Sequence, residues 1–506
     1  MAIVPRTDAP DRYRADPSVM TALRTPRLLT REVLAGLVVA MALIPEAISF
    51  SIIAGVDPRV GLFSSFVMAV SIAFLGGRPA MITAATGAIA LVIAPVAREY
   101  GMEYFIATVI LAGVFQVVLG VIGVAKLMRF IPRSVMVGFV NALAILIFTA
   151  QLPHLVGVPW LVYPLVAVGI LIMVVMPRLT TVVPAPLVAI VLITAAVVTM
   201  AIAVPTVGDQ CELPRSLPEL FIPDVPLNWE TFQIIAPYSL AMALVGLLES
   251  LMTAKLVDEI TDTHSRKTRE AWGQGVANML SGLFGGMGGC AMIGQTMINV
   301  KASGARTRIS TFLAGVFLLI LVVGLGDLVS IIPMAALVAV MIMVSVATLD
   351  WHSIRPATLK RMPKSETAVM VATVVIVVIT HNLAIGVIAG VILAMVLFAR
   401  RVAHFVSVAR TVSDGDTVPT AYYVVTGELF FASSNDLTTQ FEYADDPQRV
   451  VIDLSNSHIW DASTVAALDA ITTKYEQHGK RAVIVGLNEA SSSMQVRLGG
   501  QLGAGH

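Results

Sequence analysis

The fold is decided by two short stretches, GGRPAMITAATGAIALVIAPVA at residues 76–97 and GGMGGCAMIGQTMINVKAS at residues 285–303. Each has a glycine-rich approach and then an apolar run, 84–97 in the first and 295–303 in the second. Both runs are too short for a full helical crossing of a bilayer, which needs about 20 apolar residues. Short helices of this kind occur where broken helices line an internal site of a transporter. We therefore interpret 84–97 and 295–303 as half-helices.

The composition places most of the chain in lipid. Of its 506 residues, 57% are hydrophobic and 13% are charged, whereas soluble globular chains carry about 25% charged residues. The net charge is zero, so no nucleic-acid partner is expected. The two cysteines, Cys211 and Cys290, lie far apart and predict neither a disulfide framework nor a metal site. The sequence contains no nucleophile–base set, metal-ligand cluster or phosphate loop, so we expect neither an enzyme nor a cofactor.

Apolar runs of spanning length recur from about residue 31 to about residue 402. Their approximate starts are residues 31, 60, 103, 134, 160, 186, 232, 268, 305, 334, 366 and 384. With the two half-helices, the total is roughly fourteen segments. The sequence thus predicts an all-α polytopic membrane protein, with an N-terminal tail at 1–30 and a transmembrane transport domain at 31–402.

Basic residues between the runs indicate the orientation. Loops that follow even-numbered segments contain most of the lysines and arginines, and Arg400 and Arg401 follow the last segment. The opposite loops contain only Arg59, Arg98 and Arg215. Because lysine and arginine are retained on the cytoplasmic side, we expect the N-terminus and the C-terminal tail in the cytoplasm. The long loop at 205–231 is expected outside, and the expected location is the cell (inner) membrane, with the lipid bilayer as partner.

Two short matches suggest an internal repeat. Ala40-Met41-Ala42-Leu43 recurs as Ala241-Met242-Ala243-Leu244, an offset of 241 − 40 = 201. Ala80-Met81-Ile82 recurs as Ala291-Met292-Ile293, an offset of 291 − 80 = 211. Each repeat, about 31–204 and about 232–402, would hold seven segments. An odd number inverts the second repeat relative to the first, so inverted-topology repeats are expected.

The tail after about residue 403 is soluble in character. Residues 422–425, 450–454 and 482–485 are typical of strands, and residues 462–478 are typical of a helix. This order predicts a small α/β domain at 420–500, which a linker at 403–419 joins to the last membrane segment.

The two half-helix starts are the candidate substrate-binding site. Their residues are Thr83, Ala84, Ala85, Thr86 and Gly87 in the first and Gly294, Gln295 and Thr296 in the second. A helix N-terminus offers free backbone N–H groups and a positive dipole end, and two that face each other would bind an anion without a fixed cation. The alternative is that glycines here only permit close helix packing, as in the pairs Gly282/Gly286 and Gly285/Gly289.

Two carboxylates lie in the middle of predicted segments. Glu46 follows Pro45 in the first segment, and Glu249 lies in the eighth. A charged side chain at the centre of a bilayer costs about 2.5–3.5 kcal/mol on insertion scales, so such residues face a cavity or a partner. One interpretation is a proton-coupling site, because burial favours the neutral acid. The other is a structural carboxylate that ties helices together by hydrogen bonds.

Other polar residues have simpler interpretations. Asn141, Gln274 and Asn278 are expected to form hydrogen bonds between helices, and the stretch around Asp258 is expected to be a solvated cytoplasmic loop. In the tail, Ser463 lies near the start of a predicted helix. It would serve there as a helix cap or, alternatively, as a regulatory phosphorylation site beside the positive helix N-terminus.

Together these features resemble the SulP (sulfate permease) family of anion transporters over nearly the whole chain. Residues 54–63, AGVDPRVGLF, are similar to the family signature after the first helix, and residues 249–299 are similar to its second conserved region. The tail is similar to a STAS domain through residues 427–432, 451–454 and 461–463. The resemblance implies a core domain with the two half-helices, a gate domain, elevator-like movement of the core, and a homodimer. It also implies a substrate such as sulfate, bicarbonate, chloride, oxalate or another dicarboxylate.

One position departs from the family pattern, in which many members carry an arginine where this chain has Gln295. Without a fixed cation, an anion rests on N–H groups and dipoles, and a single dipole end contributes only about 0.3–2 kcal/mol. We hypothesise that cotransported protons offset the substrate charge, with Glu249 as the first choice of site and Glu46 as the second. The expected function is a secondary active transporter of small anions, of the oxyanion or dicarboxylate class, by proton-coupled symport. The alternatives are an electroneutral anion exchanger and a membrane sensor that signals through the STAS domain.

Overall fold

A computed structural model describes residues 17–123, 131–179, 185–209, 218–226, 228–324, 330–403, 406–413 and 418–499. The chain divides into two compact units, residues 1–391 and residues 392–506, and each contains a hydrophobic core of its own. We term the first the helical unit and the second the C-terminal unit. Helix α16 (Leu383–Ala403) begins in the first unit and ends in the second, and it is given with the helical unit below.

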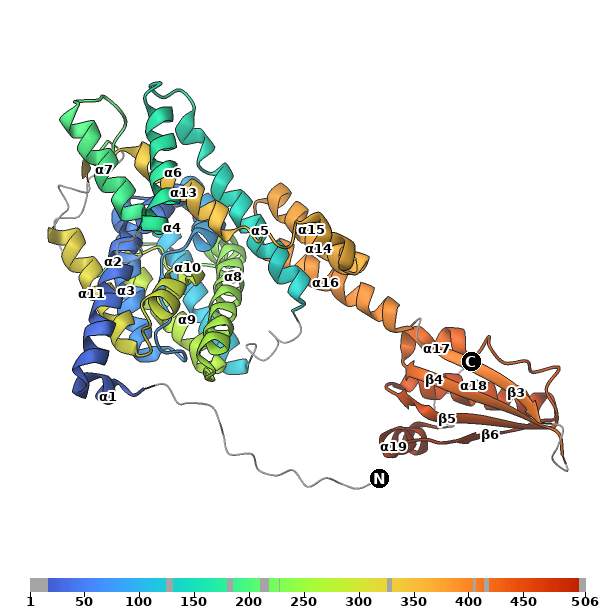
Figure 1. Cartoon of the computed structure of the whole chain (residues 1–506). Coiled ribbons are helices and arrows are strands. Elements are labelled where there is room, and N and C mark those ends of the chain that lie inside the picture. Colours follow the sequence, from blue (N-terminus) through green and yellow to red (C-terminus); the bar gives the residue numbers. More distant parts are fainter. Residues whose placement is uncertain are drawn as a thin grey trace. The chain divides into compact units, whose positions relative to one another are not determined.

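The helical unit is built from helices that fall on the apolar runs of the sequence (Figure 1). Their bounds are α1 (Val19–Arg24), α2 (Pro26–Ala54), α3 (Pro58–Leu75), α4 (Gly87–Ile122), α5 (Arg133–Thr149), α6 (Val162–Leu179), α7 (Ala185–Thr199), α8 (Trp229–Thr261), α9 (Lys267–Leu283), α10 (Ile293–Met297), α11 (Arg308–Gly324), α13 (Met334–Thr348), α14 (Pro356–Arg361), α15 (Lys364–Thr380) and α16 (Leu383–Ala403). Helix formation begins at Val19, inside the segment 1–30 that was expected to be a tail.

The length of these helices agrees with a membrane protein. Seven described helices, α2 to α6, α8 and α16, are long and apolar enough to cross a bilayer, and α7, α11 and α13 are shorter apolar helices. Each predicted run falls on a described helix. The total of fourteen crossings stays a prediction.

The first half-helix and the third predicted run form one element, α4. Gly101 inside α4 has φ of +83° and ψ of −175°, which is not a helical conformation. Glycine adopts it without steric cost because it has no Cβ. The element is therefore two helices joined across a kink, and the first of them corresponds to the predicted half-helix at 84–97. The second half-helix is α10, which continues into a π-helical turn at Ile298–Ala302.

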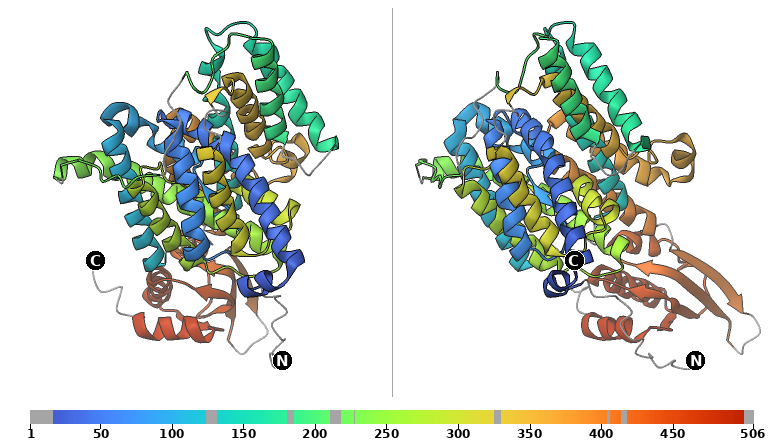
Figure 2. Two further views of the ribbon diagram at one scale, coloured as in Figure 1. Left: turned by 90° about the vertical axis from the view of Figure 1, so that its left-hand side faces the viewer. Right: turned by 60° about the vertical axis from the view of Figure 1, so that its left-hand side comes forward.

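The helices of the helical unit pack as two groups, which can be followed in the views of Figure 2. The core group contains α2, α3, α4, α8, α9 and α11, and the gate group contains α5, α6, α7, α13 and α15. Close approach in the core group relies on glycine. A Cβ on Gly113 of α4 would lie 2.6 Å from the carbonyl oxygen of Gly275 in α9, and the reverse distance is also 2.6 Å. The implied core and gate domains are thus present as packed groups.

A short strand pair sets the register of the repeat. Strand β1 (Thr83–Ala84) pairs antiparallel with β2 (Cys290–Ala291). The strands start 290 − 83 = 207 residues apart, and the helices that follow start 293 − 87 = 206 residues apart. The Ala-Met-Ile match in the sequence has an offset of 211, so it is out of this register by 211 − 207 = 4 or 211 − 206 = 5 residues. That match is a coincidence of an apolar sequence, whereas the order of strand and half-helix does recur.

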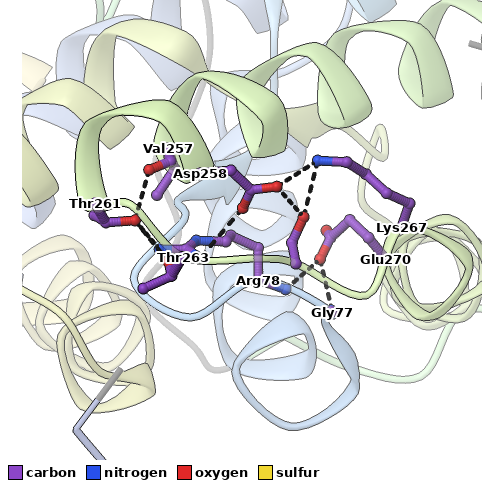
Figure 3. A network of polar contacts seen from close by, with 9 residues as sticks. Gly77, Arg78, Val257, Asp258, Thr261, Thr263, Lys267 and Glu270 are labelled. Atoms are coloured by element: carbon purple, nitrogen blue, oxygen red, sulfur yellow. Dashed lines mark hydrogen bonds and ion pairs between the residues drawn. The ribbon is translucent and has the colours of Figure 1, made fainter. Parts of the chain in front are cut away.

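A network of polar contacts ties the loop after α3 to the end of α8 and the start of α9 (Figure 3). The side chain of Arg78 is 1% exposed and donates to Asp258 Oδ1 at 3.2 Å and to Thr261 Oγ1 at 2.7 Å. Asp258 Oδ2 in turn accepts from Lys267 Nζ at 2.7 Å. A solvated loop is therefore wrong for Asp258. The local sequence could not reveal this, because Arg78 lies 180 residues earlier in the chain.

The C-terminal unit contains a four-stranded sheet in the order β3-β4-β5-β6. Its elements are β3 (Ser407–Ser413), β4 (Thr420–Leu429), α17 (Phe431–Leu437), β5 (Arg449–Ile459), α18 (Ala462–Gln477), β6 (Arg481–Val485) and α19 (Glu489–Leu498). Strand β3 is antiparallel to β4, and β4, β5 and β6 are parallel. The predicted strands lie within β4, β5 and β6. The predicted linker at 403–419 is wrong in part, because it contains β3, an exposed edge strand without the apolar alternation that reveals a strand.

Candidate anion-binding site

Both half-helices begin at the strand pair. Within the pair, Thr83 of β1 lies opposite Ala291 of β2. The chain then enters α4 at Gly87 and α10 at Ile293, a few residues after the strands. Because the strands are antiparallel, the two helices leave the pair in opposite directions. Both N-termini therefore lie at the strand pair β1–β2, a place that we term the strand crossing. Two positive dipole ends are therefore brought to one place.

The first backbone N–H groups of the half-helices lack acceptors. Such groups never have an intrahelical partner. Those of Gly87 and Ala88 in α4, and of Ile293 and Gly294 in α10, make no hydrogen bond to any residue that the structure describes. Gly87 and Ala88 are buried, whereas Ile293 is half-buried and Gly294 is exposed. Because buried N–H groups are nearly always paired in folded proteins, the unpaired groups of Gly87 and Ala88 indicate a site for a ligand that accepts hydrogen bonds.

The two helix starts differ in the space beside them. Gly294 is exposed, and a Cβ added there would meet nothing within 4 Å. At Gly87, a Cβ would lie 2.8 Å from the ring of Phe50 and 3.3 Å from Ile147 of the gate group. At Gly282, a Cβ would lie 2.6 Å from a side chain of α4, so the packing role considered for the glycines applies there. Of the two helix starts, that of α10 is therefore the more open.

Polar side chains from the surrounding helices hold the strand pair in place. Four backbone N–H groups in and beside the strands donate to such side chains. Ala85 donates to Ser65 at 3.2 Å, and Ala291 donates to Ser250 at 3.0 Å. Ile82 donates to Thr296 at 3.0 Å, and Gly289 donates to Asn278 at 2.8 Å. The hydroxyl of Thr83 accepts from Gln274 Nε2 at 2.9 Å. Among the predicted binding residues, Thr83 and Thr296 therefore already have structural partners, and Ala84 lies within β1. The interhelical hydrogen bond expected of Asn278 is confirmed, because its amide donates to Gln116 of α4 at 2.8 Å. The one expected of Gln274 is wrong, because its amide bonds to strand β1 and to Glu270 of its own helix.

Glu46 of α2 reaches the second half-helix. Its Oε1 accepts from Gln295 Nε2 at 2.8 Å, and both side chains are buried. The other polar atom of this amide, Gln295 Oε1, is buried and has no hydrogen-bond partner among the described residues. A buried oxygen without a donor costs about 1–3 kcal/mol. This cost indicates that a donor is present in some working state of the protein.

Glu249 of α8 reaches the first half-helix, α4, through Cys290. The Cys290 thiol donates to Glu249 Oε2 at 2.9 Å, and Thr86 Oγ1 lies 3.1 Å from the same sulfur. Thr86 is the N-cap of α4, and its hydroxyl accepts from the N–H of Ile89 at 3.4 Å. The three side chains form a buried chain from a carboxylate to the start of a half-helix. The sequence interpretation missed Cys290, because its contact with Glu249 spans 41 residues and depends on the strand pair.

The crossing has no fixed cation in the part of the chain that the structure describes. No arginine, lysine or histidine forms a hydrogen bond or an ion pair with Glu46, Glu249 or Gln295. Each carboxylate instead faces one neutral donor. A cavity of about 670 Å³ elsewhere in the helical unit is lined by Asp57, Phe221 and their neighbours, and it includes none of the predicted binding residues.

Ser463 lies exposed near the start of α18. The N-cap of this helix is Asp461, whose Oδ1 accepts from the N–H of Thr464 at 3.0 Å. The cap role considered for Ser463 is therefore wrong, because the carboxylate two residues earlier fills it. The hydroxyl of Ser463 is accessible to a modifying enzyme.

Known proteins share this organisation. The model of the sulfate permease family matches residues 29–162 and 159–373, and the model of the STAS domain matches residues 412–499. The chain is 52% identical over 470 residues to a protein of Bacillus subtilis named putative sulfate transporter YbaR, which covers 93% of this chain and 97% of that protein. The chain belongs to the sulfate permease family. It is a multi-pass membrane transporter with a STAS domain, and not an enzyme.

More distant relatives of this sulfate permease family member share its fold. The bicarbonate transporter BicA of Picosynechococcus is 28% identical over 426 residues, which is 77% of this chain and 74% of that protein. The solved transmembrane domain of a cyanobacterial BicA has a TM-score of 0.63 at 25% identity and covers 73% of this chain and 97% of that structure. The murine anion transporter Slc26a9 has a TM-score of 0.80 at 17% identity, covering 97% of this chain and 89% of that structure, which shows a common fold.

Proposed function

We propose that this sulfate permease family member is a secondary active transporter that moves small oxyanions or dicarboxylates together with protons. One observation carries the proposal. At the strand crossing, unpaired N–H groups of two half-helices lie beside two buried carboxylates, and each carboxylate has a single neutral partner.

The charge of the carboxylates favours symport over simple binding. Two like charges 4 Å apart repel by about 4 kcal/mol at an effective dielectric constant of about 20. One helix dipole end stabilises a bound anion by only about 0.3–2 kcal/mol. An anion at the crossing is therefore bound more tightly when Glu46 and Glu249 are neutral. Because anion and proton then favour each other's binding, they travel together.

The hydrogen bonds of Gln295 support a proton on Glu46. An ionised Glu46 can only accept, so it takes the amide N–H of Gln295 and leaves Gln295 Oε1 without a donor. A protonated Glu46 donates to that oxygen once the amide rotates. Rotation also turns both N–H bonds of the amide away from Glu46, where they become available to an anion.

The two helix groups support an elevator-like movement, in which the core group carries the crossing past the gate group. Each group packs mainly within itself, so one can shift relative to the other without unfolding. We propose a homodimer in the cell (inner) membrane, with the N-terminus and the STAS domain in the cytoplasm as the basic loops indicate. The STAS domain has a regulatory role in this proposal, with Ser463 as its phosphorylation site.

The names of the relatives guide the choice of anion. Similar proteins are named as sulfate and bicarbonate transporters. Both ions offer several oxygen acceptors to the N–H groups of two helix starts. We therefore propose an oxyanion of this kind as the first substrate to test, and a C4-dicarboxylate as the second.

Uptake by the purified protein in proteoliposomes tests the proposal. Radiolabelled sulfate, bicarbonate, chloride and a C4-dicarboxylate are supplied with and without an inward proton gradient. We expect one anion to accumulate by about tenfold per pH unit and per coupled proton, since one pH unit is about 1.36 kcal/mol. Uptake that ignores the gradient and needs an anion inside the vesicle would establish exchange instead. No uptake of any of the four anions by folded protein would contradict the proposed substrate class.

The variant Glu249→Gln tests the first-choice proton site. A glutamine oxygen can still accept from the Cys290 thiol, so the fold is expected to persist. It cannot bind the proton, so the gradient no longer drives uptake. If Glu249→Gln transports with unchanged pH dependence, Glu249 is not the coupling site, and the same measurement on Glu46→Gln follows.

A further inference from the structure

The chain from Thr86 through Cys290 to Glu249 can reverse the direction of its hydrogen bonds. The sulfur lies 2.9 Å from Glu249 Oε2 and 3.1 Å from Thr86 Oγ1. The residues are buried, with exposures of 0% for Cys290, 3% for Thr86 and 7% for Glu249. A thiol and a hydroxyl each have one proton and can also accept. The direction of both hydrogen bonds is therefore set by the protonation state of the carboxylate.

When Glu249 is ionised, the single proton of each group is fixed. The carboxylate accepts only, so the Cys290 thiol points its proton at it. The sulfur is then free to accept, and Thr86 donates its hydroxyl proton to the sulfur. Thr86 has no proton left for a ligand at the start of α4.

When Glu249 is protonated, the order reverses. The new O–H bond of Glu249 donates to the sulfur, and the thiol proton rotates toward Thr86 Oγ1. That oxygen has two acceptor sites, one for the thiol and one for the N–H of Ile89, which it already binds at 3.4 Å. The hydroxyl proton of Thr86 is thereby released. One O–H bond forms, on Glu249, and the S–H and Thr86 O–H bonds only rotate.

We propose that Cys290 is a positioning residue that converts a proton on Glu249 into an additional hydrogen-bond donor, the Thr86 hydroxyl, for the anion at the crossing. The released hydroxyl lies beside the unpaired N–H groups of Gly87 and Ala88. This inference rests on the proposed proton coupling, and it specifies how the bound proton changes affinity for the anion.

Among the groups around Glu249, Cys290 is the one whose hydrogen bonds change when Glu249 gains or loses a proton. Helices α4, α9 and α10 and strand β2 pack against α8. In the described part of the chain, Cys290 on β2 is the titratable group that contacts Glu249, and none of these elements places a charged side chain against it. Glu46 contacts Gln295 instead, so the two carboxylates act on different half-helices.

Two variants are expected to reduce the pH dependence of anion affinity, one by changing KM at high pH and the other by changing KM at low pH. In Cys290→Ala, no sulfur holds the Thr86 hydroxyl, so the KM for radiolabelled sulfate or bicarbonate falls by about tenfold at high pH and is unchanged at low pH. In Thr86→Val, the donor is missing, so KM rises by about tenfold at low pH and is unchanged at high pH. The measurement is KM against pH in proteoliposomes with equal pH on both sides.

Conservative variants provide the controls. Cys290→Ser and Thr86→Ser keep one proton and the acceptor sites at each position, so both are expected to keep the wild-type pH profile. Thermal unfolding and size-exclusion chromatography confirm that each variant is folded. If Cys290→Ala raises KM equally at every pH, or keeps the wild-type profile, the proposed role of Cys290 is overturned. Absence of proton-driven uptake by the wild type overturns the proposed function instead, so the two failures are distinguishable.

Discussion

Backbone N–H groups and buried carboxylates meet at two kinds of place in the helical unit, and they are paired in opposite ways. At the ends of the core helices they satisfy each other. Glu270 accepts from the N–H groups of Gly77 and Arg78 at 2.7 and 3.0 Å, and also from an amide of α9. Glu32 accepts from three N–H groups around the start of α11, at 2.7, 3.1 and 3.3 Å.

At the strand crossing the same groups are kept apart. The N–H groups at the starts of α4 and α10 have no acceptor among the described residues, and Glu46 and Glu249 turn toward one neutral donor each. The N–H groups of Gly87 and Ala88 are buried, and an unsatisfied buried group costs about 1–3 kcal/mol. The core helices show that this chain can pair such groups where only stability is at stake. The unpaired groups at the crossing are therefore best explained by a ligand that completes them.

The largest effect is expected at a fully paired carboxylate. Glu270→Ala leaves the N–H groups of Gly77 and Arg78 buried without an acceptor, at a cost of about 1–3 kcal/mol each. We expect loss of the folded protein, measured by expression, size-exclusion chromatography and thermal unfolding. The matched variant Glu46→Gln keeps an acceptor for Gln295 and is expected to fold. Equal unfolding temperatures of the two variants would contradict the proposed difference between Glu270 and Glu46.

Two glycines near the strand crossing differ in what surrounds them, since Gly289 is tightly packed and Gly294 borders open space. A Cβ on Gly289 would lie 1.9 Å from the carbonyl oxygen of Ala84, so Gly289→Ala must displace the strand pair and is expected to abolish transport. Gly294→Ala places its Cβ in open space, so the protein folds but loses part of the site. A rise in KM of about tenfold corresponds to about 1.4 kcal/mol. An unchanged KM in Gly294→Ala would place the anion elsewhere.

A fixed cation in place of Gln295 tests whether Glu46 binds a proton. Gln295→Arg pairs a guanidinium with Glu46 and removes the need for a proton there. We expect KM for the transported anion at high pH to fall by about tenfold, which is about 1.4 kcal/mol, with little change at low pH. Gln295→Met, which has no donor, serves as control. Retention of the full pH dependence in Gln295→Arg contradicts a proton site at Glu46.

The STAS domain contains a further carboxylate, Asp446, whose oxygens also accept several hydrogen bonds. Asp446 accepts from Tyr423 at 2.6 Å, from Tyr475 at 2.5 Å and from Arg410 Nε at 2.8 Å. Burial, and then the hydrogen bond to Asp446, raise the pKa of Tyr475 above its ordinary value, and the same causes raise the pKa of Tyr423.

Because these tyrosine pKa values are higher in the folded than in the unfolded chain, their stabilisation is present below about pH 10 and is lost above it. We expect residues 392–506 to unfold at lower temperature as the pH rises past about 10. Tyr475→Phe is expected to cost about 1 kcal/mol at neutral pH and to weaken the alkaline decrease. Circular dichroism melts at several pH values measure both. An identical alkaline decrease in the variant would show that Tyr475 is not responsible.

The smallest effect on stability is expected at Ser463. A negative charge near the start of α18 contributes about 0.3–1 kcal/mol at an exposed position, so Ser463→Asp is expected to stabilise the STAS domain slightly. Ser463→Ala is expected to have no measurable effect. A regulatory site requires the two variants to differ in transport rate in proteoliposomes. Equal transport rates would remove Ser463 from the proposal.

Local sequence patterns located the apolar helices and the two half-helices, and they showed that the chain after about residue 420 forms a small α/β domain. These properties are local, because the length of an apolar run and the spacing of glycines belong to one segment of chain. The edge strand β3 was missed for the same reason, since its exposed residues carry no apolar alternation.

How the polar groups pair depends on the three-dimensional packing of segments that are distant in the sequence. Glu46 and Gln295 are 249 residues apart, Thr86 and Cys290 are 204 apart, and Gly77 and Glu270 are 193 apart. Whether a buried carboxylate is fully paired or open to a proton depends on which distant segments meet around it. Hydrophobic length selects the segments that enter the bilayer, but hydrogen bonding inside it is a property of their contacts.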